Sequence, residues 1–322
     1  MTDARRVGLL VGRERSFPDA LIAEVARRDV GVVASYAQVD IARADAPPAY
    51  DVLVDRISHE IPCYQAWLKL AAASGTHVIN NPFFRIADDK LFDVVLAARL
   101  GVAVPKTALL PSKSFGSDIT AGSLSNLACP LDWEGLARDL GFPMYVKPHW
   151  GGGFRDVTRV TDLESLWKAY DQSGTLTLIA QEEIRWTQYV RCIVVGTSEV
   201  LPALWDPRLP HFERYVRAAV EMPPLDAAIR ARCVKDAKTL CAALGYEMNT
   251  VELAIRDGVP VAIDFMNSAP DFDISSLGPE TFGWVVDKMA DLVIARANAE
   301  RRPIMGPDAG LPRNAGEAVL RG

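Results

Sequence analysis

A lysine stands near the end of a short apolar segment in residues 142–160, FPMYVKPHWGGGFRDVTRV. The hydrophobic residues between the flanking glycine and prolines predict a buried strand that ends at about Lys147. Gly151, Gly152 and Gly153 follow at once, and glycine backbone, which has no Cβ, can close over an anion that the ammonium attracts. The stretch therefore predicts an anion-binding loop, and a solvated lysine before a tight turn is the alternative.

Two carboxylates inside apolar strands form a second candidate site. Glu252 lies within TVELAI and Asp264 within VAIDFM, and these segments predict a hairpin that turns at residues 256–258. Glu252, Asp264 and Asn267 can converge across such a hairpin. Carboxylate and amide oxygens suit Mg2+, whereas a carboxylate buried without a partner is costly. The hairpin therefore predicts a magnesium site, with a buried salt bridge to an arginine as the alternative.

Alternating strands and helices in the first part of the chain predict an open α/β unit with a parallel sheet. The expected strands are residues 5–12, 30–36, 50–57 and 76–80, and the expected helices are residues 17–29 and 60–75. Such units place ligand-facing loops at the carboxyl ends of their strands. The polar residues in these loops are either ligand contacts or ordinary surface residues: Arg13, Arg15, Arg56 and His59.

Downstream of this unit, Asp88 and Asp89 can cap a helix that runs to Leu100 and ends at Gly101. Residues 111–130 are rich in Ser, Gly and Pro and predict an exposed loop. The other expected helices are residues 131–142, 163–172, 224–244 and 280–300, and the other expected strands are residues 102–110, 177–184, 189–206, 249–258 and 259–267.

Composition limits the class of protein. The chain has 322 residues, a net charge of −6 and 49% hydrophobic residues, which is typical of a globular protein of about two domains. No apolar run is long enough to cross a bilayer and no secretory signal is evident, so we expect a cytoplasmic protein. The charges form no continuous basic face, so nucleic acid and membrane are not expected partners. Five dispersed cysteines predict reduced, mostly packing thiols.

The order of five short features resembles the ATP-grasp superfamily, and the resemblance covers nearly the whole chain. These features are Lys90 at a DDK helix start, the GVAVPKT that follows, Lys147 with its glycine loop, a QEEI segment, and the acidic hairpin that ends in asparagine and proline. The resemblance implies an α/β fold with an N-terminal open parallel α/β domain and two α+β lobes that hold nucleotide between them. It places these parts at residues 1–86, 87–180 and 181–300, followed by a loosely held tail at residues 301–322.

The resemblance also assigns roles to residues. Lys90 and Lys147 become the phosphate-contacting lysines, with Gly151, Gly152 and Gly153 in the loop over the triphosphate. A linker between the lobes would hold adenine, and its residues are Gln181, Glu182, Glu183, Ile184 and Gln188. Glu252, Asp264 and Asn267 match the magnesium ligands. The implied cofactors are ATP and Mg2+, with two ions expected and Mn2+ as a substitute.

Three departures from the family pattern affect these assignments. Two residues separate Asp264 from Asn267 where one is usual, so a β-bulge must re-aim one of them, or Asp271 or Asp273 contributes. The family's usual ribose-binding acid is replaced by Gln188 and Tyr189. The arginine that often precedes the first metal carboxylate is absent from MNTVE, which leaves other candidates for steadying an acyl phosphate: Arg191, Arg208 and Arg214. A pocket for the substrate carboxylate is expected from Arg13, Arg15, Arg208, His211 and Arg214.

The resemblance implies a carboxylate-amine ligase, similar to the glutamate-ligase and D-alanine–D-alanine ligase branches. ATP would convert a substrate carboxylate to an acyl phosphate, and an amine would displace phosphate. A kinase or a thioester-forming ligase on the same scaffold, and a nucleotide-binding regulator without turnover, are the alternatives. An oxidoreductase that binds a dinucleotide is disfavoured because LLVGRERSFP lacks the GxGxxG turn. The expected partners are small-molecule carboxylates and amines, and a homodimer is compatible with the sequence.

Overall fold

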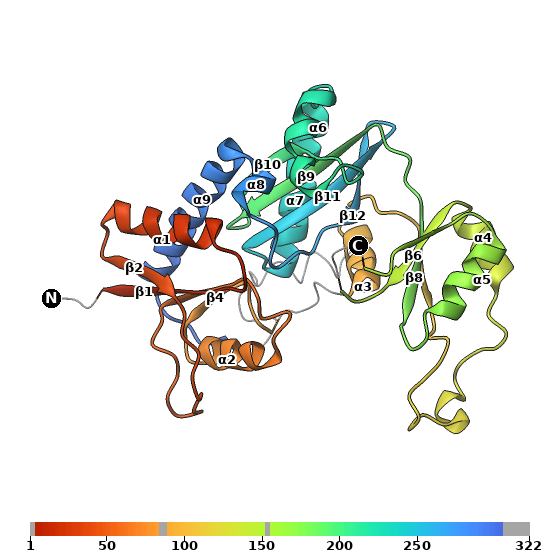
Figure 1. Cartoon of the computed structure of the whole chain (residues 1–322), viewed down its shortest axis with the longest axis horizontal. Coiled ribbons are helices and arrows are strands. Elements are labelled where there is room, and N and C mark those ends of the chain that lie inside the picture. The colour runs from red at the N-terminus through yellow and green to blue at the C-terminus, as the bar shows by residue number, and fades with distance from the viewer. Residues whose placement is uncertain (1–3, 84–88, 152–154, 305–322) are drawn as a thin grey trace.

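The computed structural model describes residues 4–83, 89–151 and 155–304 and contains three four-stranded sheets. The first and second sheets lie at opposite ends of the molecule, and the third lies between them (Figure 1). The mixed α/β architecture that the sequence predicts is confirmed. Within the described residues, every helix is too short or too polar to span a bilayer.

The first sheet is parallel, with strand order β2-β1-β3-β4. Its strands are β1 (Arg5–Leu10), β2 (Val32–Tyr36), β3 (Val52–Asp55) and β4 (His77–Ile79). Helix α2 (Pro62–Ala73) packs on one face through Trp67 and Leu68, and helix α1 (Ser16–Arg28) covers the other through Phe17 and Leu21. The parallel sheet that the alternating pattern predicts is therefore present.

The second sheet is antiparallel, with strand order β5-β8-β6-β7. Its strands are β5 (Thr107–Leu110), β6 (Met144–Pro148), β7 (Thr158–Val160) and β8 (Leu178–Glu182). Helices α4 (Trp133–Leu140) and α5 (Leu163–Gln172) share a core with it, which includes Leu166 and Tyr170. The preceding loop contains a short 3-10 turn, η1 (Ala121–Leu124). Strand β7 was not predicted, because three residues are too few to show a period.

The third sheet is antiparallel, with strand order β10-β9-β11-β12. Its strands are β9 (Gln188–Val195), β10 (Glu199–Leu204), β11 (Met248–Arg256) and β12 (Val259–Asp264). Helix α7 (Ala227–Leu244) packs on one face, and helix α9 (Pro279–Asn298) packs on the other. The short elements η2 (His211–Glu213), α6 (Val216–Glu221) and α8 (Ile274–Leu277) were not predicted.

Helix α3 (Lys90–Arg99) begins as predicted, because the Asp89 carboxylate accepts a hydrogen bond from the Phe92 amide. Asp88 lies outside the described residues. All five cysteines are free thiols, as expected; Cys192, Cys233 and Cys241 are buried, and Cys63 and Cys129 are exposed.

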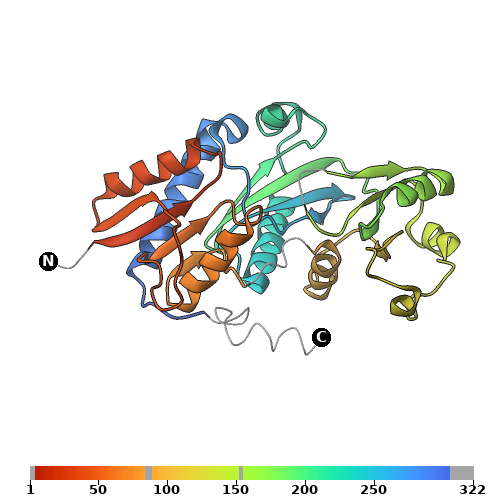
Figure 2. The same ribbon diagram turned by 60° about the horizontal axis from the view of Figure 1, so that its bottom comes forward.

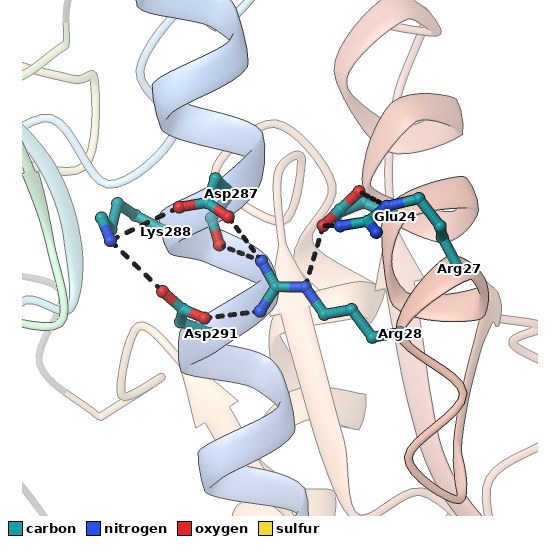
Figure 3. A network of polar contacts seen from close by, with 6 residues as sticks. All are labelled: Glu24, Arg27, Arg28, Asp287, Lys288 and Asp291. Atoms are coloured by element: carbon teal, nitrogen blue, oxygen red, sulfur yellow. Dashed lines mark hydrogen bonds and ion pairs between the residues drawn. The ribbon is translucent and has the colours of Figure 1, made fainter.

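Helix α9 connects the first and third sheets, because its apolar residues share one hydrophobic core with both. At the surface, Arg28 of α1 contacts Asp287 and Asp291 of α9, and Glu24 completes the network (Figure 3). After α9, Arg301 pairs with Asp51 at 2.6 Å. Residues 305–322 of the predicted tail lie outside the described residues, and the domain boundaries at residues 86, 180 and 300 stay predictions.

Candidate active site

Lys147 lies on β6. Its Nζ donates to Gln181 Oε1 on the neighbouring strand at 2.9 Å, and Gln181 Nε2 donates to Thr107 Oγ1 at 3.0 Å. Burial lowers the pKa of Lys147, while the negative charges of Asp264 and Glu252 oppose that shift. The lysine of the second sheet therefore interacts electrostatically with the two carboxylates of the third, and its role as a phosphate contact stays a prediction.

Lys90 is the first residue of α3 and lies beside the end of β6. Its backbone amide donates to the His149 carbonyl at 3.0 Å, and its ammonium donates to the Gly151 carbonyl. The charge of Lys90 also contributes to the lowered pKa of Lys147. The structure therefore brings the two predicted lysines together. Gly151 has a φ of +88°, in the region that favours glycine, while Gly152 and Gly153 lie outside the described residues.

Glu252 and Asp264 lie directly opposite each other on β11 and β12. Leu253 is paired with Ala262, so one extra residue, Ile263, forms a β-bulge just before Asp264. A bulge, one of the two alternatives that the unusual spacing indicated, is therefore present beside Asp264. Asn267 follows in a loop, where its backbone amide donates to the Asn249 side chain at 2.7 Å.

The two carboxylates have different surroundings. The Glu252 side chain is 12% exposed; Arg191 Nε lies 3.5 Å from Oε1, and the Tyr189 hydroxyl donates to Oε2 at 3.1 Å. Burial raises the pKa of Glu252 to about 7 against the pull of Arg191, and Asp264 raises it further. Asp264 is exposed and accepts no hydrogen bond from the described residues. The salt bridge considered as an alternative thus exists for Glu252 alone, and at a distance longer than a hydrogen bond.

The oxygen donors fit a hard divalent cation. Among the described residues, no group of three or more His, Cys, Asp or Glu side chains is placed to hold a metal ion. The candidate set instead combines two carboxylates with the amide of Asn267, which is a donor set that Mg2+ accepts. Burial is the main cause of the raised pKa of Glu252, and the charge of Asp264 adds to it; a cation between the two carboxylates would offset that repulsion.

The predicted linker lies where the second sheet passes into the third. Glu182 Oε1 accepts from the Lys106 amide at 3.0 Å, and Glu183 pairs with Arg159 at 2.6 Å. Ile184 is buried, and Gln188 Nε2 donates to the Pro223 carbonyl at 2.7 Å. The polar side chains of these residues are therefore engaged by the protein itself.

Two of the three candidate arginines meet at one tryptophan. The guanidinium of Arg191 lies 5.1 Å from the Trp205 ring and that of Arg214 lies 5.3 Å from it. Arg191 Nη2 also donates to Thr250 Oγ1 at 3.2 Å. Arg208 is separate and exposed; it pairs with Asp206 at 2.6 Å and stacks on another ring, that of Trp186.

Tyr215 completes the surroundings of Arg191 and was missed by sequence reasoning, as was Trp205. Burial raises the pKa of Tyr215 to about 12, although Arg191 opposes the shift. The hydroxyl of Tyr215 and Nε of Arg191 are both buried without a hydrogen-bond partner among the described residues. The sole sequence signal for either aromatic is its place beside an arginine-rich segment, WDPRLPHFERY.

The loops of the first sheet differ from expectation. Arg56 is neither a surface residue nor oriented to a ligand: it is buried between Phe17 and Phe272, pairs with Glu14 at 2.7 Å, and donates to the Pro270 carbonyl at 2.6 Å. It therefore connects the first sheet to the loop after β12.

The other N-terminal candidates form no common pocket with Arg208 in the described contacts. Arg13 is exposed, and Arg15 donates to the carbonyls of Gly12 and Glu14 within its own loop. His59 lies 3.8 Å from its neighbour Glu60.

The acids after β12 are also engaged. Asp271 lies 2.9 Å from His211, and Asp273 caps α8 while accepting from Ser16 at 2.8 Å. Because both acids already have partners, Asp264 is the better oxygen donor to stand beside Glu252.

The chain has the ATP-grasp fold, in which a parallel α/β unit is followed by two antiparallel lobes. The predicted fold is therefore confirmed. An ATP-grasp RimK domain protein from Sphaerobacter thermophilus superposes with a TM-score of 0.61 at 20% identity, over 88% of this chain and 98% of that one. The D-alanine–D-alanine ligase of Bacillus anthracis, complexed with ATP, gives a TM-score of 0.62 at 16% identity, over 91% and 97% of the two chains.

Sequence similarity is more limited. D-alanine–D-alanine ligase of Ralstonia nicotianae is 28% identical over 163 residues, which is 46% of this chain and 49% of that protein. The chain therefore matches about half the length of this relative. No protein-family model matches the chain.

Proposed function

We propose that the protein is an ATP-dependent ligase that activates a substrate carboxylate as an acyl phosphate and joins it to an amine, with release of ADP and phosphate. The observation that carries this proposal is the approach of Lys147, from the second sheet, to Glu252 and Asp264, from the third. A lysine and a carboxylate pair on facing lobes suit a triphosphate and its cation. The ligase names of the relatives support the same activity.

In this proposal Lys90 and Lys147 contact the phosphates, and residues 181–184 with Gln188 hold the adenine end. Glu252, Asp264 and Asn267 would hold Mg2+, which when bound supplies positive charge next to the phosphates. The number of ions and the use of Mn2+ are part of the proposal.

The protein's own groups align the reactants and neutralise charge, and the mechanism needs no nucleophilic side chain. Arg191 and Arg214, which both lie against the Trp205 ring, are the proposed partners of the acyl phosphate. Thr250 stands two residues before Glu252, and Arg191 reaches it from the neighbouring strand. Arg208, paired with Asp206 and exposed, is the weakest of the three candidates.

A turnover screen tests this function. D- and L-amino acids are supplied singly and in pairs with Mg-ATP, and ADP and phosphate are measured. The proposal expects phosphate release that requires both a carboxylate and an amine. A stable phosphorylated product formed without an amine would instead identify a kinase.

A matched pair of lysine variants ties the activity to the site. Lys147→Met should lower turnover by roughly 100-fold, the effect of losing one contact to a developing charge. Lys168→Met, an exposed lysine on α5 of the same lobe, should leave turnover unchanged. Equal turnover in both variants would remove Lys147 from the site.

A further inference from the structure

His211 forms a close pair with a carboxylate from a distant part of the chain. Its Nε2 lies 2.9 Å from Asp271 Oδ2 and 3.3 Å from the hydroxyl of Ser276. His211 begins η2, whereas Asp271 lies between β12 and α8, and Ser276 is buried in α8. The His211 side chain is nevertheless 52% exposed, so the ring is held on one side and accessible on the other.

This pair is connected to the two arginines of the proposed site through the chain and through its charge. Three residues after His211, Arg214 places its guanidinium against Trp205, where Arg191 packs as well. The charge of Asp271 acts on both Arg191 and Tyr215, and these two groups also respond to Glu252. The His211–Asp271 pair is therefore linked electrostatically to the groups that surround Glu252.

The hydrogen-bond partners of His211 determine which ring nitrogen can accept a proton. Nε2 faces an acceptor, the Asp271 carboxylate, so the neutral imidazole carries its proton there and keeps a lone pair on Nδ1. Nδ1 has no hydrogen-bond partner among the described residues. A carboxylate on one nitrogen both fixes this tautomer and stabilises the imidazolium that forms when the other nitrogen takes a proton. Asp273 also interacts electrostatically with His211, which lowers the pKa of the Asp273 carboxyl.

We infer that His211, held by Asp271, is the general base for the attacking amine, and that the second substrate enters as an ammonium ion, the amino group of an amino acid or peptide. This inference rests on the proposed ligase function. His211 Nδ1 removes one proton from the ammonium, and the nitrogen lone pair then forms the C–N bond to the acyl carbon. The C–O bond to phosphate breaks, the phosphate leaves with the electron pair, and it takes the second proton of the amine.

Hydroxylamine separates this role from a structural one, because it is largely unprotonated at neutral pH and needs no base to attack an acyl phosphate. His211→Gln and Asp271→Asn are each assayed for amide formation with the amino-acid amine found in the turnover screen, and for hydroxamate formation with hydroxylamine. Amide formation should fall roughly 100-fold, as expected for a lost general base. Hydroxamate formation should stay close to that of the unaltered protein.

Glu213→Gln is the matched control, since it removes an acid of the same short helix that pairs with Arg217 at 2.7 Å and not with His211. Both reactions should be unchanged in this variant. Equal losses with the two nucleophiles, or no loss with either, in the His211 and Asp271 variants would show that the pair merely ties η2 to α8 and would overturn the inference. Absence of hydroxamate from the unaltered protein would instead overturn the ligase function itself.

Discussion

Glu247 and Glu252 stand five residues apart at and within β11, and their carboxylates are almost equally enclosed, with side chains 10% and 12% exposed. Their pKa values nevertheless shift in opposite directions. Burial would raise the pKa of Glu247, but hydrogen bonds from His77 at 2.5 Å and Arg296 at 2.7 Å lower it. Burial raises the pKa of Glu252 to about 7, because its nearest cation, Arg191, is 3.5 Å away and Asp264 faces it.

The exposed fraction of the side chain therefore does not distinguish Glu247, a structural acid, from Glu252, the candidate metal ligand. The number and distance of neighbouring cations do distinguish them. Glu247 joins β4, β11 and α9 and is fully compensated by the protein. Glu252 is left partly compensated, and a polar group that the fold does not satisfy marks a place where a ligand can bind.

Among the substitutions that test this comparison, Asp264→Asn, opposite Glu252, should have the largest effect on turnover. Turnover should fall roughly 1000-fold, the upper range for a lost electrostatic contact in a transition state. The melting temperature without nucleotide should stay the same or rise, because the substitution removes a negative charge that repels Glu252. ADP release and thermal unfolding measure the two effects.

Asp257→Asn is the matched control in the same hairpin. Asp257 is exposed, and its φ of +53° is one that asparagine adopts readily. The Asp257→Asn substitution should leave turnover and stability unchanged. If the Asp264→Asn protein has a lowered melting temperature but full turnover, Asp264 is a structural acid like Glu247.

The pH dependence of stability should separate the two glutamates next. The folded-state pKa of Glu252 lies above its ordinary value of 4.5, so between pH 4.5 and about 7 the folded protein binds more protons than the unfolded one. The contribution of Glu252 is therefore complete below pH 4.5 and is lost as the pH rises to 7, by at most about 3 kcal/mol. Urea unfolding of the nucleotide-free protein at several pH values, compared with Glu252→Gln, measures this change. A difference that does not vary with pH over this range would contradict the unusual state of Glu252.

Glu247→Gln should lower the free energy of unfolding by about 2 kcal/mol at neutral pH, because hydrogen bonds to charged groups are lost. The pKa of Glu247 is lowered, so its contribution is present above pH 4.5 and disappears as the pH falls below that value, opposite to Glu252. Turnover per folded molecule should be unchanged. Glu300→Gln, which removes an exposed pair with Arg302, is the control and should alter neither quantity. If the Glu247→Gln protein has normal stability but low turnover, the structural role assigned to Glu247 is wrong.

Arg28→Ala should give the smallest effect, below about 1 kcal/mol, although Arg28 has three acidic partners (Figure 3). Asp287 and Asp291 are each 53% exposed, so water and salt screen these contacts. Urea unfolding in low and in high salt measures the loss, which should shrink further in high salt. A loss as large as that of Glu247→Gln would show that the number of partners matters more than their enclosure.

Much of the fold could be predicted, because long periodic segments carry their own signal. The parallel strands at the N-terminus, the Asp89 cap of α3 and the β11–β12 hairpin all formed as expected. Strand β7 and helices α6 and α8 were not predicted from the sequence, because each is shorter than the window in which a hydrophobic period can be recognised. Arg56 was misjudged because its burial depends on Phe17 and Phe272, which are far apart in the sequence. Figure 2 shows the N-terminal unit beside helix α9 of the C-terminal part.

The sequence by itself determined which residues could take part: a lysine at a strand end, glycines after it, and acids set into apolar strands. The spacing of Asp264 and Asn267 indicated either a β-bulge or a contribution from Asp271 or Asp273, and the structure has a bulge at Ile263. Only the tertiary structure decided what each acid became. Glu247 and Glu252 occupy similar apolar surroundings in the chain, but His77, Arg296 and Arg191 come to them from distant segments. The distances to those cations, which no local pattern contains, set the charge state of each carboxylate.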